Sequence, residues 1–294
     1  MSGRIVITGA GGQLGGVLAA QAARRDHDVL ALTLAQWDIT DPKAAERIVQ
    51  RGDVVINCAA YTDVDAAESD EATAHAVNAA GPQHIARACA RAGAQLIHVS
   101  TDYVFGGDAG APRRPYEPSD DTAPLGVYGR TKLAGEVAVL EALPQAIVVR
   151  TAWVYTGGIG KDFVAVMQRL AASDGPVDVV DDQSGSPTYV ADLAAALLQV
   201  AGGDVSGPIL HAANEGAISR YEQARAVFEE SGADPQRVRP VSSTQNPRPA
   251  PRPGYSALGS RESAERGLTP LRPWRSALVA ALAAADRPVP STRD

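Results

Sequence analysis

A tyrosine and a lysine four residues apart, Tyr128 and Lys132, are the pair in this sequence best suited to proton transfer. They fall inside an expected helix over residues 125–142, where positions i and i+4 share one face. Free tyrosine has a pKa near ~10, so it is a poor acid–base group at neutral pH. A nearby ammonium group and an oxidised nicotinamide would each favour the phenolate and lower that pKa. A tyrosine in this setting can protonate a carbonyl oxygen while hydride reaches the carbon, which is the chemistry of a carbonyl reductase.

Hydroxyl and carboxyl groups follow directly after an expected strand over residues 95–100. Ser100, Thr101 and Asp102 stand at its carboxyl end, and ligands of open α/β sheets bind outside the carboxyl ends of strands. A hydroxyl group there can hydrogen-bond a substrate oxygen as charge develops on it. Local capping is the ordinary role of a lone serine or threonine at a strand end. The order of the glycine turn, this strand end and the tyrosine–lysine pair favours a substrate role for Thr101.

A glycine-rich turn separates the first expected strand, residues 4–7, from the first expected helix. Gly9, Gly12 and Gly15 are spaced as GxxGxxG. We expect Gly9 to permit the tight turn, Gly12 to let the backbone approach a pyrophosphate, and Gly15 to let helix and sheet pack closely. Free N–H groups at the helix N-terminus would then bind the phosphates. The motif in its strand–turn–helix context predicts a dinucleotide site.

The sequence leaves the choice between NADPH and NADH open. An acid at the end of the second strand would bind the ribose 2′-hydroxyl and favour NADH. Thr33 and Leu34 stand there instead, so we expect use of either cofactor. Asp38 and Ile39 follow where such folds often contact adenine, although a capping turn before Pro42 explains them nearly as well.

Strands and helices alternate through the first half of the chain, and the expected strands cover residues 4–7, 28–33, 53–57, 95–100 and 146–150. These runs are short and nearly all apolar, which is typical of a parallel sheet covered on both faces. One long helix is expected over residues 71–92, with a kink at Gly81-Pro82. In the second half, helices are expected at residues 162–172, 189–201, 219–231 and 274–285, and strands at 177–180 and 209–213.

This alternation predicts the α/β class, with a Rossmann-type doubly wound parallel sheet. We expect the NAD(P)-binding domain to span residues 1–150. Residues 151–294 would form mainly a smaller C-terminal α/β substrate domain, with some segments returning to the first.

Composition narrows the function classes. The net charge of −7 argues against a general nucleic-acid or anionic-membrane surface. Cys58 and Cys89 form no CxxC pair, so reduced thiols are expected. The five histidines show no metal-ligand spacing, which predicts no catalytic metal. The N-terminus lacks the pattern of a signal peptide, and no apolar run is long enough to span a bilayer. We therefore expect a cytoplasmic protein.

Two further segments have more than one interpretation. Residues 237–275 hold eight arginines and two acids, a local charge of 8 − 2 = +6. This cluster is either a solvated face or a dock for an anion such as a nucleotide diphosphate. The glycine- and proline-rich segment 106–124 is a candidate lid over a substrate.

With these motifs in hand, the chain resembles the dTDP-4-dehydrorhamnose reductase family of extended short-chain dehydrogenases over nearly its whole length. The strings that carry the resemblance are TGAGGQLG (8–15), WDITD (37–41), NCAAYTDVDAAES (57–69), STDYVF (100–105), YGRTK (128–132), RTAWVY (150–155) and DDQSGSPTY (181–189).

The resemblance implies that NADPH or NADH reduces the 4-keto group of dTDP-4-dehydro-β-L-rhamnose to give dTDP-L-rhamnose, for cell-wall or surface polysaccharide synthesis. Tyr128 would be the proton donor, Lys132 would orient it and the nicotinamide ribose, and Thr101 would assist at the keto oxygen. Thr101, Asp102, Tyr128 and Trp153 would contact the sugar. The implied cofactor contacts are Gly9, Gly12, Gln13, Leu14, Gly15, Asp38, Ile39, Cys58, Ala59, Ala60, Tyr61, Thr62, Tyr128 and Lys132.

One string departs from the family pattern. Relatives tend to carry an RPxNSxL-like string near the C-terminus, and here residues 252–258 place Tyr255 where asparagine is expected. The exact sugar and base are therefore left open.

Two other functions compete with this interpretation. The first is a non-catalytic regulatory subunit on the same scaffold, like that of methionine adenosyltransferase; the presence of Tyr128 and Lys132 disfavours it. The second is a reductase, epimerase or dehydratase of another nucleotide sugar. A dehydratase would need an acid pair beside the catalytic threonine, and only Asp102 follows Thr101. The sequence does not determine the oligomeric state, and a homodimer is left open.

Overall fold

A computed structural model of the 294-residue chain describes residues 3–107, 114–158, 160–245 and 247–285. Its centre is a six-stranded parallel sheet with the strand order β10-β5-β4-β3-β1-β2. The strands are β1 (Ile5–Thr8), β2 (Val29–Leu32), β3 (Val54–Asn57), β4 (Gln95–Thr101), β5 (Ile147–Thr151) and β10 (Ile209–His211). The order reverses direction between β1 and β3, as in doubly wound folds, and the predicted fold class is confirmed.

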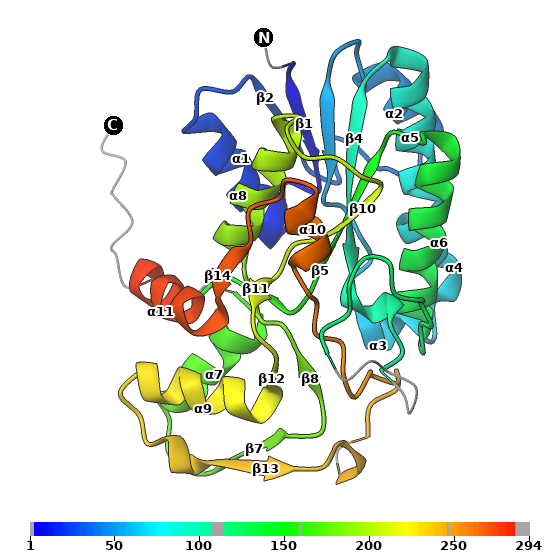
Figure 1. The fold of residues 1–294 in the computed structure, drawn as a ribbon. Helices are drawn as coiled ribbons and strands as arrows, with labels where there is room; N and C mark the ends of the chain where they lie inside the picture. Colours follow the sequence, from blue (N-terminus) through cyan, green and yellow to red (C-terminus); the bar gives the residue numbers. More distant parts are fainter. Residues whose placement is uncertain (1–2, 108–113, 159, 246, 286–294) are drawn as a thin grey trace.

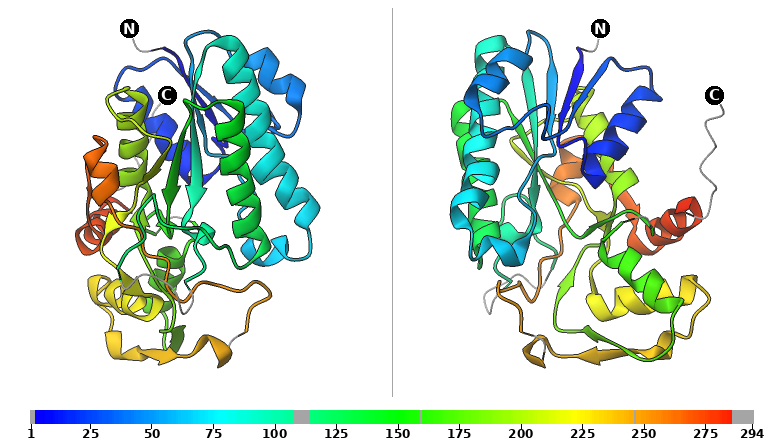
Figure 2. Two further views of the ribbon diagram at one scale, coloured as in Figure 1. Left: turned by 45° about the vertical axis from the view of Figure 1, so that its right-hand side comes forward. Right: turned by 180° about the vertical axis from the view of Figure 1, so that it is seen from behind.

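Helices cover both faces of this sheet (Figures 1 and 2). On one face lie α1 (Gln13–Ala23) and α8 (Val190–Ala201), and on the other α2 (Pro42–Ile48), α5 (Gly81–Ala92) and α6 (Val127–Ala142). The apolar strand residues pack alternately into these two layers, so the sheet has a separate hydrophobic core on each side. Burial on both faces explains why the strands are apolar runs without polar alternation.

The long helix expected over residues 71–92 is interrupted. It begins as α4 (Glu71–His75), passes through a π-helical turn over Ala76–Ala80, and continues as α5 from Gly81. The π turn, directly before Gly81-Pro82, takes the place of the simple proline kink that we expected. Such turns often mark functional sites, and this one contains Asn78.

A second, smaller lobe lies below the sheet in Figure 1. Its core is formed by α7 (Phe163–Ala171), α9 (Arg220–Glu230) and α11 (Trp274–Ala285), with the parallel pair β7 (Val177–Val180) and β13 (Val238–Val241). Short strand pairs connect the two lobes: β6 (Val154–Tyr155) with β9 (Thr188–Tyr189), β8 (Ser184–Gly185) with β12 (Ile218–Ser219), and β11 (Asn214–Glu215) with β14 (Leu271–Pro273). These strands of two or three residues carry no sequence pattern that predicts them.

The sheet also draws on the second half of the chain. Strand β10 pairs with β5 at the sheet edge, and α8 packs against α1. The division of the chain at residue 150 therefore stays a prediction. Two further short helices, α3 (Val64–Ala67) and α10 (Arg261–Glu265), were not expected. Within the described part of the chain, no helix has the length and apolar character needed to cross a membrane.

Candidate active site

The glycine turn after β1 has the backbone that the sequence predicts. Gly9 has φ +66°, and a Cβ on it would lie 2.8 Å from the backbone nitrogen of Ala59 at the tip of β3. A Cβ on Gly15 would collide with the carbonyl oxygen of Gly9. Both positions therefore require glycine, because β1, β3 and α1 meet here without room for side chains.

The N-terminus of α1 is suited to an anion. Gly12 is its N-cap and provides no side-chain hydrogen bond, so the first N–H groups of the helix are left for a ligand. Gly12 and Gln13 are exposed, whereas Leu14 is half-buried against the sheet. The Gln13 side chain points away toward the second lobe, where it donates a hydrogen bond to Asp162 (3.2 Å). These residues fit the pyrophosphate of a dinucleotide.

The end of β2 lies beside this turn. The Thr33 methyl group is 3.7 Å from the point where a Cβ of Gly11 would stand. The Thr33 hydroxyl bonds Gln36 (3.0 Å), so no carboxylate is presented there. Asp38 is exposed and accepts hydrogen bonds from the backbone N–H and the hydroxyl of Thr40. This is the capping turn expected before Pro42. Ile39 is buried against Gly81. Cofactor contacts by Asp38 and Ile39 stay predictions.

Residues 58–62 continue from β3 along the same edge. Cys58, Ala59 and Ala60 are half-buried, and Thr62 is exposed. Burial raises the pKa of the Cys58 thiol to about 12, so it stays protonated. Tyr61 is held by Asn78, whose amide accepts a hydrogen bond from the Tyr61 N–H (2.8 Å) and donates one to its carbonyl (3.1 Å). The π turn thus fixes the tip that the sequence assigns to the cofactor.

Thr101 and Tyr128 meet at the end of β4. The Thr101 hydroxyl lies close enough to the Tyr128 phenol to lower its pKa, and the Tyr128 ring packs edge-on against Tyr103 with centroids 5.5 Å apart. Burial raises the pKa of Tyr128, and the negative charge of Asp102 raises it further, whereas the Thr101 hydroxyl lowers it. The lowered pKa expected from sequence is absent in this structure, and Tyr128 holds its proton at neutral pH.

Lys132 lies one turn further along α6 and is 2% exposed. Its ammonium donates a hydrogen bond to the Val99 carbonyl (2.7 Å). Burial lowers its pKa to about 8, and the charge of Glu136 opposes that change. Glu136 is itself buried, in an ion pair with Arg150 (2.7 Å) and a hydrogen bond from Ser100 (2.5 Å). Lys132 therefore lies next to a buried polar cluster formed by Glu136, Arg150 and Ser100.

Asp102 is buried beside this pair. Its carboxylate accepts hydrogen bonds from Ser256 (2.6 Å) and Thr101 (3.2 Å), yet burial raises its pKa to about 6. Ser256 belongs to residues 247–258, a segment that runs from the second lobe across to the first, and which we call the strap (Figure 1). The sequence gives no signal for this contact, because 154 positions separate the two residues.

Trp153 lies where β5 gives way to the second lobe, and its backbone is strained, with φ +44°. The guanidinium of Arg220 stacks on its ring, 3.5 Å from the centroid. Sugar stacking on that face would require Arg220 to move, so the sugar contact of Trp153 stays a prediction. Among the described residues, no carboxylate lies within ion-pair distance of Arg220, and burial lowers its pKa to about 10, which still leaves it charged at neutral pH. Sequence reasoning missed Arg220.

A cavity of about 950 Å³ opens between the two lobes beside these residues. Its lining includes the aromatic and apolar side chains of Tyr103, Phe163 and Met167 and three cations, Arg220, Arg248 and Arg252. Its size and mixed lining suit a nucleotide-sized ligand.

All eight arginines between residues 237 and 275 have partners. Six pair with carboxylates, and Arg237 and Arg266 donate to backbone carbonyls. The cluster is therefore mainly structural, and only Arg248 and Arg252 line the cavity.

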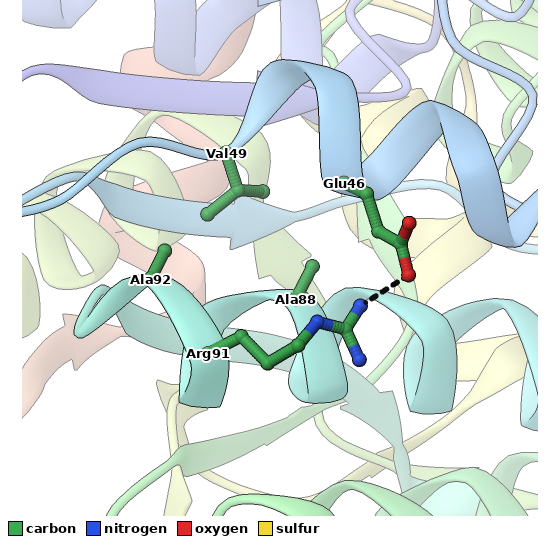
Figure 3. Close-up of a pocket in the computed structure, with 5 residues that line it drawn as sticks. All are labelled: Glu46, Val49, Ala88, Arg91 and Ala92. Atoms are coloured by element: carbon green, nitrogen blue, oxygen red, sulfur yellow. Dashed lines mark hydrogen bonds and ion pairs between the residues drawn. The ribbon is translucent and has the colours of Figure 1, made fainter.

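A second hollow lies between α2 and α5, lined by Glu46, Val49, Ala88, Arg91 and Ala92 (Figure 3). Its polar content is an exposed ion pair between Arg91 and Glu46 (2.7 Å). It lies among the covering helices and holds none of the predicted site residues, so we place no chemistry there.

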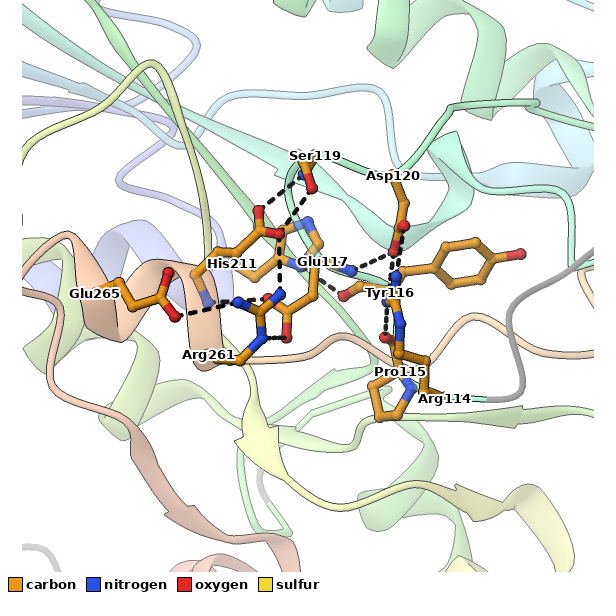
Figure 4. A network of polar contacts seen from close by, with 10 residues as sticks. Arg114, Pro115, Tyr116, Glu117, Ser119, Asp120, His211, Arg261 and Glu265 are labelled. Atoms are coloured by element: carbon orange, nitrogen blue, oxygen red, sulfur yellow. Dashed lines mark hydrogen bonds and ion pairs between the residues drawn. The ribbon is translucent and has the colours of Figure 1, made fainter.

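The predicted lid, residues 106–124, lies partly outside the described residues, which omit 108–113. Residues 114–120 are hydrogen-bonded to the strap, and Figure 4 shows their contacts with α10. The Tyr116 N–H donates to the Ala257 carbonyl (2.8 Å), and the Ser119 hydroxyl to Glu262 (2.7 Å). Arg114 and Asp120 close the turn with an ion pair (2.7 Å). These contacts do not favour a lid built from residues 114–120.

Metal-ligating side chains do not gather in the described ranges, where no group of three or more His, Cys, Asp or Glu residues could hold an ion.

Known proteins share both this sequence and this fold. A family model described as the RmlD substrate binding domain matches residues 3–287. A dTDP-4-dehydrorhamnose reductase of Mycobacterium tuberculosis is 74% identical over 100% of this chain and 99% of its own. The solved dTDP-4-dehydrorhamnose reductase of Bacillus anthracis, in complex with NADP, has a TM-score of 0.90 at 35% identity, covering 97% of this chain and all of that one. A dTDP-4-dehydrorhamnose reductase from Clostridium acetobutylicum gives the same TM-score and coverage at 36% identity.

Proposed function

This chain belongs to the family of the RmlD substrate binding domain and is an NAD(P)H-dependent dTDP-4-dehydrorhamnose reductase, and we propose that Thr101, Tyr128 and Lys132 carry its chemistry. The reaction reduces the 4-keto group of dTDP-4-dehydro-β-L-rhamnose to give dTDP-L-rhamnose. The observation that carries the residue assignment is the position of the Tyr128 phenol beside the Thr101 hydroxyl at the end of β4, with Lys132 one turn further along α6.

The residues around the glycine turn fit a dinucleotide. The uncapped N-terminus of α1 accepts the pyrophosphate, and the small residues 58–60 leave room beside the catalytic pair. When bound, the nicotinamide supplies the hydride. No acid is presented beside Thr33 to repel a 2′-phosphate, which agrees with the NADP in the Bacillus anthracis relative.

Tyr128 is the proton donor. Its raised pKa keeps the phenol protonated until a keto oxygen needs the proton. Thr101 lies beside the same phenol and would bond the keto oxygen as charge develops on it. Lys132 brings a positive charge on the same helix face, which stabilises the phenolate left after transfer. Thr101 and Lys132 are buried, which keeps water from competing for them.

The nucleotide diphosphate is assigned to the cavity between the lobes. Arg220 lines it and forms no ion pair with a carboxylate of the described residues, and a guanidinium binds phosphate oxygens through several N–H groups at once. A regulatory subunit would have no use for the contact between Thr101 and Tyr128, so the catalytic function is the better account. Cytoplasmic location and a homodimer stay predictions.

The test follows NADPH and NADH oxidation by the pure protein with dTDP-4-dehydro-β-L-rhamnose, made in situ. We expect Tyr128→Phe to lower kcat by at least about a hundredfold, because the proton donor is removed. Tyr155→Phe is the matched control, since the buried Tyr155 hydroxyl has no hydrogen-bond partner in the described structure, and its rate should stay within about twofold.

Equal losses in the two variants would assign the effect to packing and contradict the role of Tyr128. Cofactor binding without oxidation by the unsubstituted protein would point to another keto-sugar. The two cofactor rates measure the preference that Thr33 leaves open.

A further inference from the structure

The short helix α3 lies at the junction of the cofactor tip, the catalytic helix and the strap. It follows residues 58–62 directly, and Asp63 caps its N-terminus by accepting a hydrogen bond from the Ala66 N–H (3.0 Å). In Figure 1, α3 lies at the lower end of the sheet domain, next to the strap. None of its contacts has a part in the mechanism proposed above.

One carboxylate of this helix binds three groups of the strap. Asp65 accepts two hydrogen bonds from Arg252 (2.8 and 3.0 Å), two from Arg248 (3.1 and 2.9 Å), and one from the Ala250 N–H (3.2 Å). The arginines and the backbone amide lower the pKa of Asp65, so it is charged at all ordinary pH values. Bidentate arginine–carboxylate pairs fix geometry as well as adding energy. We call this group the clasp.

Two contacts link α3 and the clasp to the catalytic residues. Arg252 lies close enough to the Tyr103 phenol for the two groups to shift each other's pKa, and the Tyr103 ring packs on Tyr128. Three residues beyond Asp65, Glu68 accepts a hydrogen bond from the Val127 N–H (2.7 Å), at the first turn of α6 and next to Tyr128. Segment 58–68 therefore touches the cofactor edge at one end and holds both the strap and the catalytic helix at the other.

Resting on the proposed function, we infer that Asp65 is a positioning residue that couples cofactor binding to nucleotide-sugar binding. A dinucleotide orders residues 58–62, this order passes to α3, and Asp65 then holds Arg248 and Arg252 along the wall of the cavity. Without Asp65 the strap loses its hold on the cofactor domain at this point. The affinity of the cavity for the nucleotide would then no longer depend on whether the cofactor is bound.

The decisive measurement is the Kd of dTDP, by calorimetry, for the free protein and for the protein saturated with NADPH. We expect NADPH to tighten dTDP binding at least about fivefold in the unsubstituted protein. Asp65→Asn should reduce this ratio to below about twofold and raise the KM for the sugar nucleotide, with kcat and the Kd of NADPH nearly unchanged. A merely structural role would lower kcat and stability without changing the ratio.

Asp192→Asn is the matched control. Asp192 also accepts a two-point contact from an arginine distant in sequence, Arg272 (2.9 and 2.6 Å), but away from the cavity. It should keep the coupling ratio. If Asp65→Asn folds poorly, Arg248→Gln removes two of the five contacts from a largely exposed side chain and should lower the ratio partly.

Hydrogen exchange with NADPH alone separates this inference from the proposed function. The Ala250 amide should exchange more slowly when NADPH is bound, and Asp65→Asn should abolish that protection. Failure of dTDP to bind would overturn the choice of nucleotide, yet the exchange result would still decide the coupling. An unchanged ratio, or equal protection in Asp65→Asn, would overturn the role of Asp65.

Discussion

The catalytic cluster, which comprises Thr101, Asp102, Tyr128 and Lys132, and the clasp lie beside the same cavity. The pKa values of their charged groups are shifted by opposite causes. In the catalytic cluster, burial dominates: it raises the pKa of Asp102 to about 6 and lowers that of Lys132 to about 8. In the clasp, hydrogen bonds from two arginines and an amide dominate, and they lower the pKa of Asp65. Both regions contain an aspartate that receives hydrogen bonds from the strap.

The difference shows how one fold separates proton handling from positioning. Burial disfavours the charged form of a group, so it raises the pKa of Asp102 and Tyr128 and lowers that of Lys132. A carboxylate with arginines on both oxygens has a permanent charge and a fixed place. The catalytic cluster is therefore expected to reduce stability at neutral pH, and the clasp to add to it.

The largest effect is expected for Asp102→Asn. Because the folded protein holds the Asp102 proton up to about pH 6 and the unfolded chain only to about 3.8, stability from this proton is lost as pH rises through that window. The free energy of unfolding of the variant, relative to that of the unsubstituted protein, should rise by roughly 3 kcal/mol between pH 4 and 7. Urea unfolding at several pH values measures this difference. If the stabilities of the two proteins changed in parallel with pH, the claim that burial destabilises the ionised Asp102 would be contradicted.

For Asp65→Asn, the difference in stability from the unsubstituted protein should have the opposite pH dependence and be smaller. A lowered pKa contributes stability that is present above the ordinary aspartate range and lost as the solution is acidified. Thermal melting should find the variant about 1–2 kcal/mol less stable at pH 7, a value reduced for partial exposure, with the gap closing below about pH 3. A gap that widens on acidification would show that the comparison between the two regions is mistaken.

The smallest effect is expected at Tyr255, between the two strap residues that bind Asp65 and Asp102. Its ring packs with Tyr116 (centroids 6.4 Å apart), and its backbone faces Gly107. Tyr255→Asn should lose about 1 kcal/mol of stability by removing half-buried aromatic surface. Its KM for the sugar should change less than about threefold, as measured by steady-state NADPH oxidation. A changed preference between sugar epimers would instead make Tyr255 a specificity residue.

Most of the sheet could be predicted because each strand carries its own evidence. The apolar runs ending at Asn57 and Thr101 and the glycine turn are all local signals. The paired two-residue strands of the second lobe could not be predicted, since their partners alone define them. The π turn at Asn78 likewise depends on α6, whose Gly135 lets the helix pack against the Asn78 carbonyl.

The sequence by itself determined the chemistry that one element can carry. Helix periodicity places Tyr128 and Lys132 on one face, and a strand end places Thr101 and Asp102 at the edge of the sheet. Only the tertiary structure decided the pKa of these groups and the partners of Asp65, which lie up to 187 positions away. The physical reason is that spacing along a helix or strand is fixed by backbone geometry, whereas burial and the meeting of strap and α3 depend on how the two lobes pack.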